Sequence, residues 1–341
     1  MAPRPEPPHV AARAEARMQA VLGPRLRDRG WRPTVVPVVA YGAPGWARVM
    51  CRVLLRPPGT PGEQVRDGRG WRHFLTAKAT GTAITVRLGD RLIDLVTGTG
   101  GYVDARLDCD LPPGWHTARL QAEGGEAVEV PVRIVAPGPG LGLLSDIDDT
   151  VLVTMLPRPV VALRNAFLLR ESARQPVPGM AALYREVLEA EPDAFVVYLS
   201  TGAWNTAGAL TAFLRRHDYP VGPLLLTDWG PTQTGWFRSG QEHKRAQLRR
   251  LLEELPQLRW LLVGDDGQHD PSLYAEVAAA QPDRVLGVAI RQLSATEQVA
   301  THGTPGPKDP GVLSEAAVLA PDGQGLGRLL RERGIVLGPR A

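Results

Sequence analysis

The hydrophobic pattern of the chain changes its period at the Pro- and Gly-rich segment APGPGLG, residues 136–142. Before this segment, short runs such as ARVMCRVLL, AITVRL and RLIDLV are rich in β-branched residues and are separated by turn residues, which is typical of antiparallel strands. After it, apolar runs such as AFVVYLS and RWLLVGDD alternate with helical stretches. This alternation indicates βαβ units and a parallel sheet. The segment therefore predicts a boundary between two domains of different architecture.

We expect an α/β fold in the second part, with a parallel sheet that has helices on both faces, preceded by an antiparallel β-sandwich domain. Within the sandwich, ITVRLGDRLIDL is typical of a hairpin whose two-residue loop is Gly89 and Asp90. The expected segments are an N-terminal helical segment at 1–30, the β-sandwich at 31–137, the α/β domain at 138–300, and a C-terminal tail with a helix at 301–341.

Composition limits the classes of partner and compartment. The 341 residues are 43% hydrophobic and 22% charged, which is typical of a soluble protein of about two domains. The net charge of +3 is not gathered in one basic block, so we expect no nucleic-acid partner. Cys51 and Cys109 are the only cysteines, which favours a reducing compartment.

The apolar segments of the chain are short. The N-terminus lacks the apolar core of a signal peptide, and no stretch approaches 18 uncharged apolar residues, so we expect no transmembrane segment. We expect a cytoplasmic protein, with peripheral contact to a membrane left open. The pattern does not determine the oligomeric state.

Chemically active side chains follow the predicted parallel strands or open a neighbouring helix. These side chains are Asp146, Asp148, Ser200, Thr201, Lys244 and Asp265. The carboxyl ends of parallel strands meet at one edge of a sheet, where ligands bind. Two carboxylates at ~4 Å repel each other by about 4 kcal/mol at a protein-like dielectric constant, so a hard cation such as Mg²⁺ is expected among them.

Several short sequence motifs resemble those of known phosphatases. SDIDDTV after a strand resembles the nucleophile motif of the haloacid dehalogenase (HAD) superfamily, and Ser200, Lys244 and GDD match its later motifs in order. More narrowly, LLSDIDDTV, PVPGMAALYREV, YLSTGAW, LTDWG, HK and GDDGQHDPSLY resemble the catalytic family of actin-patch-associated phosphatidate phosphatases. The resemblance covers residues 140–290. It implies a HAD-like Rossmannoid fold and hydrolysis of a phosphomonoester, with phosphatidate at a membrane surface as the substrate.

The resemblance also implies roles for individual residues. Asp146 would be the nucleophile that forms an aspartyl-phosphate, and Asp148 would be the general acid and base. Ser200 and Lys244 would bind the phosphoryl oxygens, with Thr201 as the rival of Ser200.

The implied metal ion is Mg²⁺, held by the Asp146 side chain, the Asp148 backbone carbonyl and Asp265. Whether Asp266 or Asp270 also contacts the ion is left open. Asp270 precedes a proline, and this pattern is equally typical of an N-cap followed by proline at the first helical position.

Three alternatives to this interpretation of the site can be compared with the sequence. A calcium-binding EF-hand loop that begins at Asp146 needs Gly at its sixth position and Glu at its twelfth, where this chain has Val151 and Pro157. A phosphatase of a soluble metabolite or phosphoprotein stays open, because STGAW and GDDGQ depart from the usual family pattern. A non-catalytic module that binds a phosphorylated ligand is disfavoured, because the predicted nucleophile, acid, lysine and metal ligand are all present.

Overall fold

A computed structural model describes residues 22–62, 77–153, 175–227, 240–267, 269–302 and 317–335 of the chain. The chain divides into two compact units. The first comprises Met1–Ala136, Gly202–Ala209 and Leu226–His243. The second comprises Pro137–Thr201, Leu210–Leu225 and Lys244–Ala341. Of the predicted N-terminal helical segment, residues 22–28 are helical, and residues 1–21 lie outside the described part.

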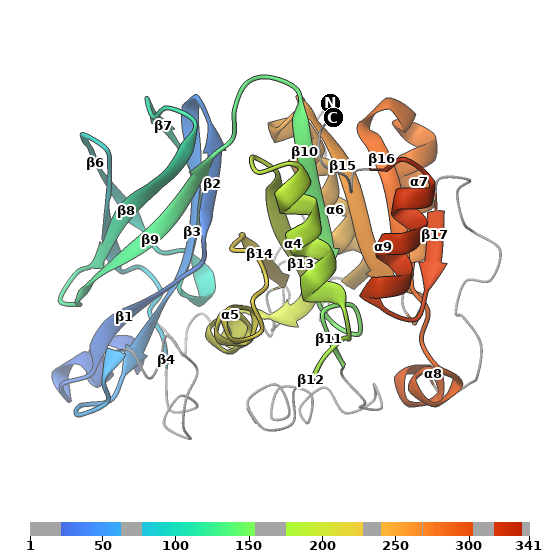
Figure 1. Cartoon of the computed structure of the whole chain (residues 1–341). Coiled ribbons are helices and arrows are strands. Elements are labelled where there is room, and N and C mark those ends of the chain that lie inside the picture. The colour runs from blue at the N-terminus through green and yellow to red at the C-terminus, as the bar shows by residue number, and fades with distance from the viewer. Residues whose placement is uncertain are drawn as a thin grey trace, which may run out of the picture. The chain divides into compact units, whose positions relative to one another are not determined.

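The first unit contains a nine-stranded sheet, in which most neighbours are antiparallel and the order is β1-β3-β2-β9-β8-β5-β6. The long strand β3 also pairs with β4 and β7. Figure 1 shows these strands in blue to green. Their bounds are β1 Arg32–Pro37, β2 Ala40–Ala43, β3 Gly45–Arg56, β4 Ala77–Lys78, β5 Ala83–Leu88, β6 Arg91–Val96, β7 Tyr102–Cys109, β8 Gly114–Ala122 and β9 Ala127–Ile134.

The predicted hairpin in this sheet is confirmed. Strands β5 and β6 pair antiparallel up to Leu88 and Arg91, which leaves Gly89 and Asp90 as the loop. Gly89 has a φ of +57°, a conformation that glycine adopts without steric cost. Alternate residues of β5 and β8 are buried, so the two-residue period of the sequence reflects one face turned toward the apolar core.

The second unit is built on a six-stranded sheet with the order β14-β13-β10-β15-β16-β17. Strand β10 is parallel to both of its neighbours, and the β15–β16 and β16–β17 pairs are also parallel. The strand bounds are β10 Gly140–Asp146, β13 Phe195–Ala203, β14 Leu224–Thr227, β15 Leu258–Asp265, β16 Val285–Arg291 and β17 Ala317–Ala320. A small antiparallel pair joins β11 Leu152–Val153 to β12 Gln175–Pro176.

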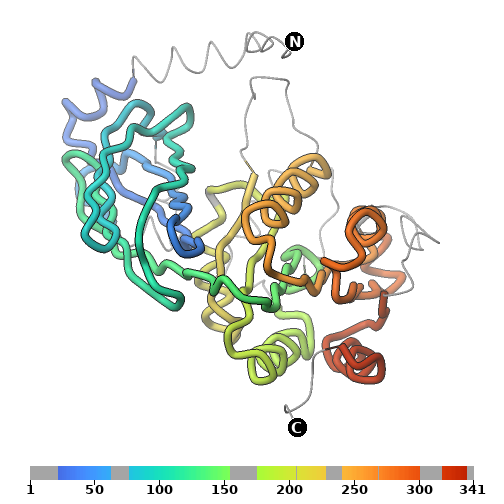
Figure 2. The backbone as a smooth tube through the Cα atoms, turned by 90° about the horizontal axis from the view of Figure 1, so that it is seen from above, coloured from blue at the N-terminus to red at the C-terminus, as the bar shows by residue number. Residues whose placement is uncertain are grey.

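Helices cover the parallel sheet, as the sequence predicted. Figure 2 shows α4 and α9 on one side of the sheet and α6 on the other. In the described part of the chain, no helix combines the length and apolar character that a bilayer span requires. The helix bounds are α4 Met180–Ala190, α5 Ala207–Arg216, α6 Gly240–Glu254, α7 Asp270–Ala280, α8 Ala295–His302 and α9 Gly323–Glu332.

The sixth strand, β17, lies in residues 301–341, where the sequence predicted a tail with a helix. The predicted helix is present as α9, but β17 adds to the edge of the parallel sheet beside β16. Its four residues, AVLA, are too few to show a period, so the pattern did not reveal a strand.

The centre of this sheet is closely packed around Trp260. The Trp260 side chain is fully buried and meets Phe195 edge to face, with ring centroids 6.2 Å apart. Gly142 lies opposite Trp260 in the register of β10 and β15. A Cβ atom at Gly142 would lie 2.5 Å from the Trp260 ring, so the glycine is required by the approach of the indole.

We predict that Gly142→Ala destabilises the protein by about 1–3 kcal/mol, because the added methyl group must displace a buried indole from a packed core. Gly138→Ala is the matched control, since a Cβ atom at Gly138 meets no atom within 4 Å. The measurement is the free energy of unfolding from urea denaturation. Equal stabilities for the two variants would contradict this account of the packing.

Candidate metal centre

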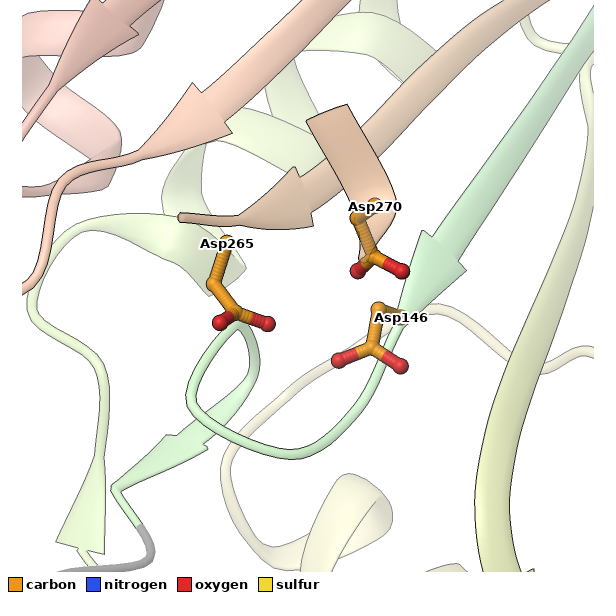
Figure 3. A group of neighbouring side chains, drawn as sticks. All are labelled: Asp146, Asp265 and Asp270. Atoms are coloured by element: carbon orange, nitrogen blue, oxygen red, sulfur yellow. The ribbon is translucent and has the colours of Figure 1, made fainter. Parts of the chain in front are cut away.

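Three buried carboxylates converge at the carboxyl edge of the parallel sheet. Asp146 is the last residue of β10, Asp265 is the last residue of β15, and Asp270 is the first residue of α7. Each offers one carboxylate oxygen to a group whose members all lie within 4.8 Å of one another. Figure 3 shows the three side chains pointing toward a common space. The convergence follows from the topology, because β10 and β15 are adjacent parallel strands that end at the same edge.

A glycine allows the third carboxylate to approach. A Cβ atom at Gly264 would lie 2.6 Å from Asp270 Oδ2 and 2.8 Å from the Asp270 Cβ atom. Glycine at this position of β15 therefore lets the first turn of α7 pack directly against the strand end. Asp270 reaches the group for this reason, although four residues lie between it and Asp265 in the sequence.

One buried ammonium group joins the carboxylates. Lys244 lies on α6, and its Nζ atom is 2.6 Å from Asp146 Oδ1 and 2.6 Å from Asp270 Oδ1. Only 3% of the Lys244 side chain is exposed. Burial alone would lower the pKa of Lys244, but the surrounding carboxylates outweigh it and raise that pKa above its ordinary value. The lysine therefore remains a cation.

The charge of the cluster is not balanced by this lysine. Three ionised carboxylates and one ammonium group sum to −2. Burial raises the pKa of Asp146 to about 8, aided by Asp270 and Asp148 and opposed by Lys244. Burial likewise raises the pKa of Asp265 well above its ordinary value. The electrostatic cost of ionising the group is therefore high unless another cation is present.

The oxygen atoms of the cluster fit a divalent metal ion. Asp146 Oδ2 and Asp270 Oδ2 are both buried, and no hydrogen bond reaches either atom from the residues that the structure describes. Buried acceptors without a donor are costly, and they are suitable ligands for a hard cation. A divalent ion would also neutralise the residual charge of −2. The buried group of Asp146, Asp265 and Asp270 can therefore bind a metal ion.

The predicted acid and the predicted phosphate-binding serine form a second pair. Asp148 lies two residues beyond the end of β10 and is buried. Ser200, on β13, donates a hydrogen bond of 2.9 Å to Asp148 Oδ2. Thr201 is the next residue of β13 and is half-buried. The structure thus joins the predicted Asp146, Lys244 and Asp265 in one cluster and pairs Asp148 with Ser200.

Asp266 and Asp270, which the sequence left open, lie in different surroundings. Asp266 accepts a hydrogen bond of 2.8 Å from the Leu293 backbone N–H, so its carboxylate is engaged away from the cluster. The N-cap of α7 is His269, and the Asp270 carboxylate is directed toward Lys244 instead of capping the helix. In the loop after β10, the Thr150 Oγ1 atom donates to Asp265 Oδ2 at 3.5 Å.

A family comparison agrees with this arrangement. The family model described as the catalytic domain of phosphatidate phosphatase APP1 matches residues 141–292. The predicted resemblance to the actin-patch-associated phosphatidate phosphatase catalytic family is therefore confirmed for this segment. The match includes the strands that end in Asp146 and Asp265 and the helix that carries Lys244.

Two curated relatives each match a little under half of the chain. An uncharacterized protein of Schizosaccharomyces pombe, C29B5.04c, is 27% identical over 155 residues, which is 45% of this chain and 25% of that protein. Phosphatidate phosphatase APP1 of Saccharomyces cerevisiae is 26% identical over 163 residues, which is 47% of this chain and 27% of that protein. The matched segment thus spans about a quarter of each relative.

Two solved structures show a distant likeness. The HAD domain of the effector protein Lem4 from Legionella pneumophila is 13% identical with a TM-score of 0.33, and the likeness covers 59% of this chain and 96% of that one. The carbohydrate acetylesterase XAC1771 from Xanthomonas citri is 10% identical with a TM-score of 0.31, over 90% of this chain and 75% of that one. Both TM-scores are low, so neither likeness identifies the fold.

We predict that stabilisation by Mg²⁺ grows as the pH rises from 6 to 9. The raised pKa of about 8 leaves the Asp146 carboxyl protonated at pH 6 in the metal-free folded protein, so metal binding must release a proton there. The measurement is the Mg²⁺-induced shift in Tm at each pH. A shift that is equal at both pH values would contradict the prediction.

The Asp146 carboxyl has an ordinary pKa of 3.8. Between about pH 4 and pH 8, the folded state therefore holds a proton on Asp146 that the unfolded state has lost. The metal-free protein therefore loses stability as the pH rises through this window. Asp146→Asn should remove this contribution, raise the metal-free Tm at pH 8 and abolish most of the Mg²⁺-induced shift.

We predict that Asp270→Asn weakens Mg²⁺ binding by roughly 10- to 100-fold, because it removes one of the three negative charges of the buried cluster. Asp266→Asn is the matched control, since the neighbouring Asp266 carboxylate is engaged by the Leu293 N–H. Isothermal titration calorimetry measures both affinities. If the two variants bind Mg²⁺ equally well, Asp270 has no part in the metal centre.

Proposed function

Because residues 141–292 match the catalytic domain of phosphatidate phosphatase APP1, we propose that the chain is a Mg²⁺-dependent phosphomonoester hydrolase of the HAD type. The observation that carries this proposal is the buried contact between Asp146 and Lys244 at the carboxyl edge of the sheet, with Asp265 and Asp270 beside it. This arrangement brings a carboxylate nucleophile and a cationic group into one small volume, as phosphoryl transfer requires.

The proposal includes a domain organisation. The catalytic part is a HAD-like Rossmannoid domain at residues 138–300, preceded by an antiparallel β-sandwich at 31–137 with an accessory role. Within residues 1–30 the described residues 22–28 are helical, and within residues 301–341 β17 and α9 add to the sheet and the helical layer of the catalytic part.

The proposed metal ligands are the side chains of Asp146 and Asp265 and the backbone carbonyl of Asp148, with the Asp270 carboxylate adjacent. When bound, Mg²⁺ would neutralise the carboxylates, keep Asp146 ionised and screen it from the anionic substrate. The donor set supports this choice of ion, because oxygen ligands alone suit Mg²⁺.

The reaction proceeds in two displacements at phosphorus. A carboxylate oxygen of Asp146 attacks the phosphorus atom, the bond between phosphorus and the leaving alkoxide oxygen breaks, and the proton of Asp148 passes to that oxygen. Water then attacks the aspartyl-phosphate, its proton passes to Asp148, and phosphate leaves with the regenerated Asp146 carboxylate. In the structure Ser200 donates its hydroxyl proton to Asp148 Oδ2, so this hydroxyl group would turn toward the substrate when a phosphoryl oxygen is bound.

Lys244 acts on both the nucleophile and the substrate. Its contacts with Asp146 and Asp270 hold the ammonium group at the carboxylate cluster, where it would bind an equatorial phosphoryl oxygen. Ser200 and Thr201 would contribute hydroxyl groups to the same oxygens. The fixed position of this cation would reduce the reorganisation needed as negative charge develops.

The proposed substrate is phosphatidate, which would give diacylglycerol and phosphate. This assignment comes from the resemblance to phosphatidate phosphatase APP1, and the alternative is a soluble phosphoester. The protein would meet a phosphatidate substrate at a membrane surface.

We predict that the wild-type protein releases phosphate from a chromogenic phosphomonoester and from phosphatidate micelles in the presence of Mg²⁺. Asp146→Asn should abolish turnover, because it removes the nucleophile. Asp148→Asn should lower kcat by roughly 10²- to 10⁴-fold and leave substrate binding largely intact, because it removes the proton donor. The measurement is steady-state phosphate release with and without a chelator.

Asp104→Asn controls for the general effect of losing a carboxylate, since Asp104 pairs with Arg48 on the other unit's sheet. Turnover by Asp146→Asn at the wild-type rate would mean that another group is the nucleophile. Higher kcat/KM for soluble phosphoesters than for phosphatidate would replace the lipid substrate with a soluble one.

A further inference from the structure

Arg291 is a buried arginine that connects three segments of the second unit. It is the last residue of β16, it is 5% exposed, and it lies beside Asp265 in the register of β15 and β16. Its Nη1 atom donates to the Asp149 carbonyl at 2.7 Å and its Nη2 atom to Glu297 Oε1 at 2.6 Å. Its Nε atom donates to the Pro321 carbonyl at 3.2 Å.

The bond to Asp149 reaches an unusual point of the backbone. Asp149 follows Asp148 directly and has a φ of +60°, in the left-handed region that non-glycine residues seldom adopt. Its N–H donates to the Leu152 carbonyl at 2.8 Å, which closes the loop after β10. Such a conformation persists only where the surroundings hold it, and Arg291 binds the carbonyl of that same residue.

The arginine is itself held in place. Glu297 accepts from Arg291 and also from the Ser294 backbone N–H at the start of α8. Burial would raise the pKa of Glu297, but the hydrogen bonds from Arg291 and Ser294 outweigh it and lower that pKa, so Glu297 stays ionised. The planar guanidinium group therefore has a fixed orientation, which a flexible lysine at this position would not reproduce.

We propose that Arg291 is a positioning residue. Through its bond to the Asp149 carbonyl, it holds the loop after β10 in the conformation that places Asp146 and Asp148 for catalysis. The inference rests on the proposed function of that loop. Arg291 acts through the backbone, because two of its three hydrogen bonds go to carbonyl groups and the third to Glu297. Loss of its bond to Asp149 would let the loop relax and would move both aspartates relative to Asp265.

The chain offers a matched control in Arg284. Arg284 precedes β16 and also donates to backbone carbonyls, those of Leu258, Leu255 and Leu252, at 2.9, 3.0 and 3.4 Å. Leu258 is the first residue of β15 and Asp265 is the last. Arg284 therefore binds the backbone at the end of the sheet that is opposite to the carboxylates. Replacement of either arginine removes hydrogen bonds to backbone carbonyls, which are part-buried for Arg284, but of the two only Arg291 contacts the loop after β10.

The experiment compares Arg291→Ala, Arg291→Lys and Arg284→Ala in the full chain. The assays are kcat and KM for a chromogenic phosphomonoester, and Mg²⁺ affinity by calorimetry without substrate. Arg291→Ala should lower kcat by roughly 10- to 100-fold with little change in KM, because small displacements of reacting groups are costly. It should also weaken Mg²⁺ binding by roughly 10-fold. Arg291→Lys should resemble Arg291→Ala, and Arg284→Ala should lower Tm with wild-type kcat and Mg²⁺ affinity.

Glu297→Gln keeps the arginine but weakens its anchor, so it tests the proposal even where Arg291→Ala does not fold, and it should lower kcat in the same direction. Wild-type kcat in Arg291→Lys, or an equal loss of kcat in Arg284→Ala, would overturn the proposal. If the wild-type protein hydrolyses no phosphomonoester, the proposed function fails, and the Mg²⁺ affinities still decide the role of Arg291. In that case, an Arg291→Ala variant that binds Mg²⁺ as tightly as the wild-type protein would reject the proposed role of Arg291.

Discussion

The burial of three carboxylates beside a single ammonium group is the constraint on which this structure depends. Asp146, Asp265 and Asp270 lie at one edge of a sheet and are almost completely removed from water, and Lys244 compensates only one of their charges. An arrangement of this kind is unfavourable for folding, because desolvation and mutual repulsion both oppose ionisation. Proteins retain such arrangements where they serve chemistry, so the raised pKa of Asp146 indicates a functional site as much as a cost to stability.

The parallel sheet makes the arrangement possible. Strand β10 lies in the middle of the sheet between β13 and β15, and the chain crosses first to one side of it and later to the other. The carboxyl end of β10 is therefore a point where loops from both sides diverge and leave room for a ligand. Packing fixes the strands that define this point. Gly142 admits Trp260 at the centre of the sheet, and Gly264 admits Asp270 at its edge.

Part of this site could be predicted from the sequence and part could not. That Asp146 and Asp265 meet follows from two apolar strands that each end in aspartate, because parallel strands end at one edge. Asp270 stayed open because an aspartate before proline is equally suited to capping a helix, and only the packing against Gly264 directs its carboxylate inward. Arg291 gave no signal, since one arginine after an apolar strand resembles any strand end, and two of its acceptors, the carbonyl groups of Asp149 and Pro321, are remote in sequence.

The sign of the cluster's charge also bears on how a phosphoester could be bound. A phosphomonoester dianion that approached the cluster with all three carboxylates ionised would meet net repulsion, because the group would then carry a charge of −2. At separations of ~4 Å each unpaired charge contributes about 4 kcal/mol at a protein-like dielectric constant, which exceeds what one hydrogen bond from Ser200 returns. The positive charge of Lys244 does not overcome this repulsion, because it compensates only one of the three carboxylates. The proposed reaction therefore requires that the carboxylates be neutralised before the substrate is bound.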